Sequence, residues 1–248
     1  MTAKIAIYNP APKSGSTLFC LNLAVALAQR GQKVLLVTGS EMSDLASSSY
    51  PRLSVSASGT ENWQGGSDDQ YDFVMLDIES DQPAIAKSVL SKSDEVILPV
   101  PATRYSLKAL AAALKLISEV RAGNSNLKLH AIVETKRSEG PSTDDDSPEN
   151  NTMETIRSLY PGLLKYPTVA DSDEYYDSYQ NRKSIIEVDP TNAPSAAFQQ
   201  IAEALAPGDD AEGVKRRALK RHGKGQPPAK DGFFDILSDK FSSLFSSK

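Results

Sequence analysis

Residues 4–31 read KIAIYNPAPKSGSTLFCLNLAVALAQRG. Lys4–Tyr8 is a short apolar run typical of a buried strand, and Asn9–Ser16 is a turn rich in Pro, Ser and Gly. Thr17–Arg30 repeats apolar residues at helical spacing and ends before Gly31, a residue type favoured just after a helix. The stretch therefore predicts a strand, a turn and a helix in succession, which is the first part of a βαβ unit.

The same alternation of strands and helices continues along most of the chain. Further strands are predicted at Lys33–Val37, Tyr71–Ile78, Glu95–Val100 and Lys128–Glu134, and helices at 83–92, 104–122, Thr152–Leu159, Asp171–Tyr179 and Ala193–Leu205. Residues 38–70 are rich in Ser, Gly and Asp and are predicted to form loops with at most a short helix. This pattern indicates an α/β fold, with a doubly wound, mostly parallel sheet flanked by helices.

Composition excludes several classes of protein. The chain has 248 residues, of which 40% are hydrophobic and 24% charged, so it can bury a sizeable core. One cysteine, Cys20, excludes a disulfide framework, and only two histidines, His130 and His222, argue against a His-based metal site. We interpret Cys20 and His130 as structural residues. No apolar run approaches the roughly 20 residues of a membrane-spanning helix, and no signal-peptide segment is present, which favours a cytoplasmic location.

The net charge of −5 is unevenly distributed along the chain. Residues 214–248 carry nine Lys or Arg and three Asp, a net charge of +6, so residues 1–213 carry −11. An acidic body argues against a general nucleic-acid binder, whereas a basic tail attracts phosphate groups. We predict an α/β domain over 1–206, a basic flexible linker over 207–230 and an amphipathic helix over 231–248.

Residues 10–17 lie where a phosphate-binding loop would follow a first strand. The general pattern is G-x-x-x-x-G-K-S/T, in which freed backbone N–H groups surround the phosphates, the lysine reaches the β and γ oxygens, and the hydroxyl binds Mg²⁺. Gly15 and Thr17 match this pattern, but Pro10 stands at the first glycine and Ser16 at the lysine. Taken alone, the window favours an ordinary strand-to-helix turn.

Five further parts of the chain carry a recognisable pattern: LNLAVALA at 21–28, GQKVLLV at 31–37, YDFVMLD at 71–77, SDEVILPV at 93–100 with SLKAL at 106–110, and IIEVDP at 185–190. In order and spacing these segments resemble the ParA/MinD family of deviant-Walker P-loop ATPases, which position DNA, division proteins and other cargo, with YDFVMLD as the Walker B strand. The resemblance covers about residues 3–206 and implies a P-loop-NTPase-like fold.

The loop departs from the family pattern, which reads Lys-Gly-Gly-x-Gly-Lys-Thr. Anchored on Gly15 and Thr17, the pattern places the lysine that crosses the dimer at Ala11 and the Walker lysine at Ser16. The family also has Asp-x-Asp after the second strand, and its second aspartate helps to set up the attacking water. This chain has Thr38-Gly39-Ser40 there, so Ser40 stands at the catalytic position. The resemblance therefore implies that both loop lysines and the catalytic aspartate are lost, so no catalytic residue is assigned.

A degenerate nucleotide site is predicted at Lys13, Gly15, Ser16, Thr17 and Asp77. In the family, the positions of Thr17 and Asp77 serve Mg²⁺, so they would hold metal here only with a bound Mg-nucleotide. Lys13 could compensate for the lost lysines by swinging over the phosphates. Asp77 alone could equally cap a helix or accept loop N–H groups. Thr135-Lys136 follows a strand where the family places base-contacting residues, although polar residues at strand ends are common.

The last 18 residues carry an amphipathic pattern. One helical stripe is formed by the apolar residues Phe233, Phe234, Leu237, Phe241, Leu244 and Phe245. The pattern is typical of an interfacial helix and resembles the membrane-targeting helix of MinD members of the family, but this helix carries a net charge of −1 and its basic residues lie upstream. The alternative is docking onto the body or a partner groove. Nucleic acid is disfavoured, because no stacking aromatic lies among the basic residues.

Three functional hypotheses follow. The leading one is a ParA/MinD-like positioning protein that has lost ATP hydrolysis, needs no cofactor, and acts as a dimerising scaffold attached to membrane or partner by its tail. The second is an unconventional ATPase that uses Lys13 in place of the Walker lysine, binds ATP and Mg²⁺, and cycles between membrane and cytosol. The third is an interaction module in which the fold serves only dimerisation. The partners expected are a second copy or a ParA/MinD-type partner protein, at the cytoplasmic membrane surface.

Overall fold

The structure is a computed structural model of the 248-residue chain. It describes residues 2–11, 14–39, 50–65, 68–78, 82–101, 104–135, 162–164, 166–170, 172–181 and 183–206. The predicted helix Thr152–Leu159, the linker 207–230 and the amphipathic helix 231–248 lie outside these residues. The domain boundaries therefore stay predictions.

In the described part of the chain, six strands form one parallel sheet in the order β3-β2-β4-β1-β5-β6. The strands are β1 (Ala3–Tyr8), β2 (Val34–Val37), β3 (Leu53–Ser56), β4 (Phe73–Ile78), β5 (Glu95–Pro101) and β6 (Lys128–Thr135). β1 lies inside the sheet, with β4 on one side and β5 on the other. The prediction of a doubly wound, parallel sheet is confirmed.

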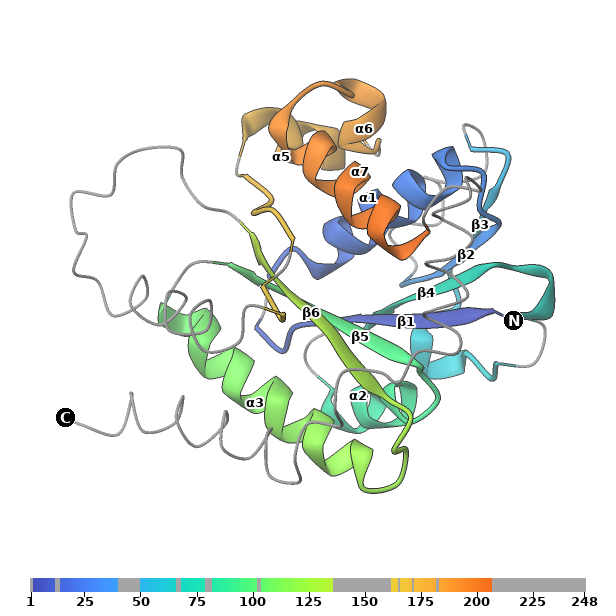
Figure 1. The fold of residues 1–248 in the computed structure, drawn as a ribbon, viewed down its shortest axis with the longest axis vertical. Coiled ribbons are helices and arrows are strands. Elements are labelled where there is room, and N and C mark those ends of the chain that lie inside the picture. Colours follow the sequence, from blue (N-terminus) through green and yellow to red (C-terminus); the bar gives the residue numbers. More distant parts are fainter. Residues whose placement is uncertain are drawn as a thin grey trace.

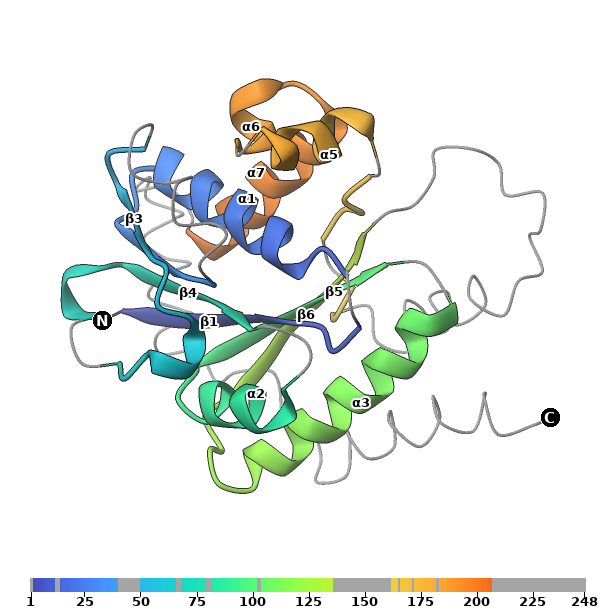
Figure 2. The ribbon, with the colours of Figure 1, turned by 180° about the vertical axis from the view of Figure 1, so that it is seen from behind.

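Helices cover both faces of the sheet (Figure 1). The described helices are α1 (Ser16–Gln29), α2 (Pro83–Leu90), α3 (Arg104–Arg121), α5 (Asp173–Gln180), α6 (Ile185–Val188) and α7 (Ala193–Leu205), with two short 3-10 helices, η2 (Thr60–Asn62) and η3 (Asp68–Gln70). α1 and the α5–α7 group lie on one face, and α2 and α3 on the other, as the view from behind also shows (Figure 2). This three-layer arrangement is the one that βαβ units build.

The alternation of side chains along β1 creates two separate cores. Ile5 and Ile7 pack into the core beneath α1 and α7, whereas Ala6 and Tyr8 pack into the core beneath α2 and α3. α1 is buried almost all round, because the sheet lies on one side of it and α7 on the other. A helix enclosed in this way is apolar on every side, which explains why residues 18–28 are all hydrophobic except Asn22.

The prediction for residues 38–70 was wrong in one respect. β3 (Leu53–Ser56) is a parallel edge strand within this region, where only loops and a short helix were expected. Its sequence, LSVS, is too short and too polar to be distinguished from a loop by its pattern. Hydrogen bonds to β2 create the strand: Val34 N–H donates to the Arg52 carbonyl at 2.8 Å, and Thr38 N–H donates to the Ser56 carbonyl at 3.0 Å.

Candidate functional site

The carboxyl edge of the sheet brings together the end of β4 and the loop that follows β1. Ile7 of β1 pairs with Asp77 of β4, and Val37 of β2 pairs with Leu76. Thr38, the first residue after β2, therefore lies beside Asp77. This edge, outside the carboxyl ends of the strands next to the point where the strand order reverses, is where ligands bind in open α/β sheets.

Asp77 and Thr38 form a buried pair at this edge. The Thr38 hydroxyl donates a hydrogen bond to Asp77 Oδ2 at 2.8 Å, and the two residues are 1% and 2% exposed, respectively. Thr38 occupies the first aspartate position of the Asp-x-Asp pattern expected after the second strand. At this position the family pattern has an aspartate, whereas this chain has a neutral hydroxyl that contacts the Asp77 carboxylate.

The first part of the loop is held by the side chain of Asn9. Asn9 Nδ2 donates to the Pro99 carbonyl at 2.6 Å, and Asn9 Oδ1 accepts the Ala11 N–H at 2.8 Å. Asn9 therefore ties the loop to β5 and satisfies one backbone donor within the loop itself. Pro10 contributes no N–H. The loop keeps its conformation here through protein contacts, which sequence reasoning did not identify, although the Asn-Pro dipeptide is a recognised turn signal.

The start of α1 carries the other predicted site residues. Gly15 adopts a left-handed backbone, with φ 80°, and its carbonyl accepts the Phe19 N–H at 2.9 Å. Ser16, at the Walker-lysine position, is buried, and its hydroxyl accepts a hydrogen bond from the Ser14 hydroxyl at 3.3 Å. Thr17 is half-buried. Ser16 is therefore a short, neutral residue that is hydrogen-bonded within the loop, at the position where the family pattern has a lysine.

Cys20 lies one turn further along α1. It is fully buried, which confirms its interpretation as a core residue. Burial raises the pKa of the Cys20 thiol well above its usual value, and the negative charge of Asp77 adds to the shift.

The structure therefore brings Gly15, Ser16, Thr17 and Asp77 to one edge of the sheet. Lys13, the predicted compensating cation, lies outside the described residues, as do Ser40 and the six apolar residues of the tail. The predicted roles of all these residues stay predictions. Within the described ranges, no group of three or more His, Cys, Asp or Glu side chains could hold a metal ion.

Thr135 ends β6 at the same edge. It forms an isolated parallel bridge with Val169, it is 5% exposed, and its hydroxyl has no hydrogen-bond partner among the described residues. Lys136 lies outside the described residues. The expected contact of Thr135 with a nucleotide base is not tested by this geometry and stays a prediction.

His130 is a structural residue, as predicted. Its Nε2 lies 2.6 Å from the hydroxyl of Tyr166, whose ring stacks on the imidazole, and its Nδ1 contacts a carboxylate oxygen of Glu95. Burial raises the pKa of the Tyr166 phenol, and the charge of Glu95 raises it further. These contacts join β5, β6 and the segment around residue 166. Both ring nitrogens of His130 therefore contact other residues of the protein.

Comparisons with known proteins identify the fold. No protein-family model matches the sequence. The chromosome-partitioning ATPase Soj of Thermus thermophilus is 36% identical over 69 residues, which are 27% of this chain and 28% of Soj. The matches to curated relatives span 28% to 51% of those relatives' own lengths.

The helices that the structure describes include none with the length and hydropathy needed to span a membrane.

Two solved structures cover most of the chain. Apo McdA of Cyanthece superposes with a TM-score of 0.65 at 12% identity, over 81% of this chain and 99% of McdA. The septum site-determining protein MinD of Pyrococcus horikoshii, complexed with Mg-ADP, superposes with a TM-score of 0.61 at 17% identity, over 87% of this chain and 99% of MinD. At these identities the structures establish a shared fold. The shared fold confirms the resemblance to the ParA/MinD family and the predicted P-loop-NTPase-like architecture.

Proposed function

We propose that this protein is a ParA/MinD-like positioning protein that acts without hydrolysing ATP. Two groups of observations support the proposal. The fold and the partial match to Soj connect the chain with proteins named for partitioning and septum-site determination. The described loop residues differ from a working ATPase site in charge and in hydrogen bonding. In our proposal the chain acts as a dimerising scaffold that reaches a membrane or a partner through its tail.

The hydrogen bond from Thr38 to Asp77 is the observation that carries this proposal. In the family pattern the second aspartate of Asp-x-Asp helps to set up the attacking water, and Ser40 stands at that position in this chain. Thr38 stands at the first aspartate, and its neutral hydroxyl donates to the carboxylate that the resemblance assigns to Mg²⁺. Phosphoryl transfer depends on positioning and charge stabilisation, so a site without these groups is expected to be inactive.

The loop also fits a nucleoside triphosphate poorly. Such a ligand carries about four negative charges, and each lost charge-assisted hydrogen bond costs roughly 1.5–3 kcal/mol. Among the described loop residues, Ser16 replaces the Walker lysine and the Ala11 N–H is already bonded to Asn9. Lys13 is the basis of the alternative, in which an unconventional ATPase uses Lys13 for charge and Thr17 and Asp77 for Mg²⁺.

Calorimetry and phosphate release on the full-length protein test the proposal. We expect no heat on titration with Mg-ATP at protein concentrations that would detect micromolar binding, and no steady-state phosphate release above a protein-free blank. The variants Lys13→Ala and Lys128→Ala form a matched pair, since each removes one cation and Lys128 is exposed at the start of β6, at the opposite edge of the sheet from the loop. Turnover that is lost in Lys13→Ala and retained in Lys128→Ala would overturn the proposal and establish the alternative.

A further inference from the structure

A groove of about 480 Å³ opens at the edge of the sheet opposite the phosphate-loop region. Its lining residues precede or begin β2, β3 and β4: Lys33, Pro51, Arg52, Ser54, Gln70 and Tyr71. We call it the amino-edge groove. Its place at the amino ends of the strands separates it from the site discussed above, so an inference about it does not depend on the proposed function.

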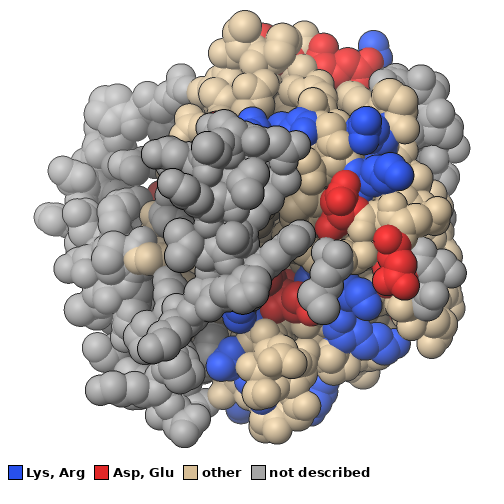
Figure 3. All heavy atoms as spheres, turned by 45° about the vertical axis from the view of Figure 1, so that its right-hand side comes forward, with Lys and Arg blue, Asp and Glu red and all other residues tan. Residues whose placement is uncertain are grey.

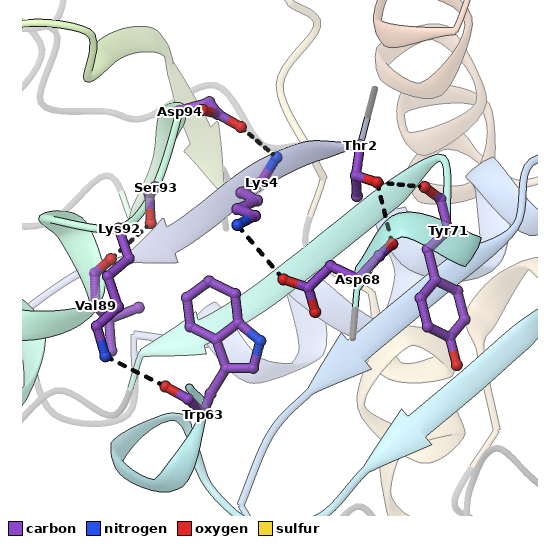
Figure 4. A network of polar contacts seen from close by, with 9 residues as sticks. All are labelled: Thr2, Lys4, Trp63, Asp68, Tyr71, Val89, Lys92, Ser93 and Asp94. Atoms are coloured by element: carbon purple, nitrogen blue, oxygen red, sulfur yellow. Dashed lines mark hydrogen bonds and ion pairs between the residues drawn. The ribbon is translucent and has the colours of Figure 1, made fainter. Parts of the chain in front are cut away.

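One wall of the amino-edge groove is fixed by polar contacts behind it. The Thr2 hydroxyl donates to the carbonyls of Asp68 and Tyr71 at 3.0 and 2.8 Å, and Lys4 Nζ lies 3.5 Å from Asp68 Oδ2 (Figure 4). The same ammonium lies 5.5 Å from the ring centroid of the buried Trp63. These contacts hold η3, so Gln70 and Tyr71 present a pre-formed wall to a ligand.

The groove also holds two cations, Lys33 and Arg52, and both side chains are exposed. Within the described part of the chain, neither forms an ion pair with a carboxylate. Arg52 Nη1 donates to the Gly31 carbonyl at 2.9 Å, which positions the guanidinium beside the groove. Acidic residues flank these lining residues in the sequence: Asp69 precedes Gln70 and Asp72 follows Tyr71, and the Asp72 carboxylate accepts the Lys33 backbone N–H at 2.9 Å. Basic groups lie beside acidic ones over this side of the molecule (Figure 3).

We propose that the amino-edge groove binds an acidic peptide segment of a partner protein. An arginine fork and a lysine recognise a carboxylate by charge-assisted hydrogen bonds, and tyrosine is enriched at protein interfaces. Five of the six lining residues are exposed and Tyr71 is half-buried, so the groove is shallow. A small ligand is normally buried over most of its surface, whereas an extended peptide can lie in a shallow groove.

Fluorescence anisotropy of a labelled ten-residue peptide of alternating Glu and Ser tests this proposal. We expect the full-length protein to bind this peptide at physiological ionic strength and to bind a Gln-for-Glu version at least about tenfold more weakly. The double variant Lys33→Glu/Arg52→Glu should lose about tenfold or more in affinity. Arg52→Lys, which keeps the charge but removes the fork, should lose a few-fold.

The basic tail is the main competing explanation for peptide binding. Residues 214–248 carry a net charge of +6 and attract acidic peptides without any contribution from the groove. The control Lys108→Glu/Lys115→Glu makes the same charge change on exposed residues of α3. Equal loss in both double variants, or equal binding by all proteins, would overturn the proposal in favour of non-specific attraction. Displacement of the peptide by inorganic phosphate at constant ionic strength would overturn it in favour of a free-anion site. Binding lost only in the groove variant supports it.

Discussion

Asn22 shows how much of this fold depends on single polar residues. It is fully buried on α1, and its Oδ1 accepts both the Ser184 hydroxyl at 2.7 Å and the Ile185 N–H at 2.9 Å. Its Nδ2 donates to the Leu18 carbonyl at 2.8 Å. Ser184 in turn accepts the Ile186 N–H and begins α6. One side chain therefore joins the helix after the loop to the closing segment of the chain.

We expect Asn22→Ala to lower the free energy of unfolding by about 2–4 kcal/mol, because two buried donors lose their acceptor. Urea denaturation measures this loss as a lower midpoint with an unchanged slope. The control is Asn62→Ala, since Asn62 is exposed and should change stability by less than about 0.5 kcal/mol. Equal shifts in the two variants would show that the Asn22 network does not stabilise the fold.

At the scale of the element, α7 closes the core over α1. Phe198 of α7 contacts Phe19 of α1 edge-on, with ring centroids 5.2 Å apart, and its centroid lies 6.1 Å from that of Tyr175 in α5. Asn192 caps α7 by accepting the Ser195 N–H at 2.9 Å. The helix is thus started by its cap and held by one aromatic cluster that joins three helices.

Phe198→Ala should destabilise the protein by about 3–5 kcal/mol, because it empties a fully buried site enclosed by three helices. Gln199→Ala, the next residue and an exposed one, is the matched control and should have little effect. Thermal unfolding followed by circular dichroism compares the two variants. A similar melting temperature for both would mean that α7 is not packed as the structure has it.

At the scale of the whole molecule, the distribution of charge separates body from tail. Residues 1–213 carry −11 and residues 214–248 carry +6. Near an anionic lipid surface, each basic residue of the tail contributes about 1 kcal/mol, while the acidic body is repelled. The proposed membrane attachment therefore needs both the basic linker, for attraction, and the apolar stripe, for insertion.

Phe241→Glu should abolish co-sedimentation of the full-length protein with vesicles rich in anionic phosphatidylglycerol, because it places a charge in the apolar stripe. Ser243→Glu adds the same charge on the opposite side of the predicted helix and should leave most of the sedimentation intact. Unchanged sedimentation of Phe241→Glu, or none for the unaltered protein, would contradict membrane binding and favour a tail that docks on protein.

The sequence-based prediction succeeded where signals are local. α7 (Ala193–Leu205) matches its predicted bounds, because its apolar spacing agrees with its ends. β4 was predicted from a nearly continuous apolar run, which a strand buried on both faces requires. The positions of Gly15 to Thr17 and Asp77 were likewise readable from order and spacing. The resemblance also predicted the loss of the lysine at Ser16, without showing what its hydroxyl contacts.

The sequence alone determines the alternation of strands and helices, the resemblance to the family and the altered loop. Each of these features depends on residues that lie close together in the chain. The edge strand β3 appears only in the folded chain, since its hydrogen bonds come from β2. The pairs Thr38–Asp77 and Asn22–Ser184 join residues 39 and 162 positions apart. Contacts at such separations, and the amino-edge groove with them, exist only when the parallel sheet aligns its strands.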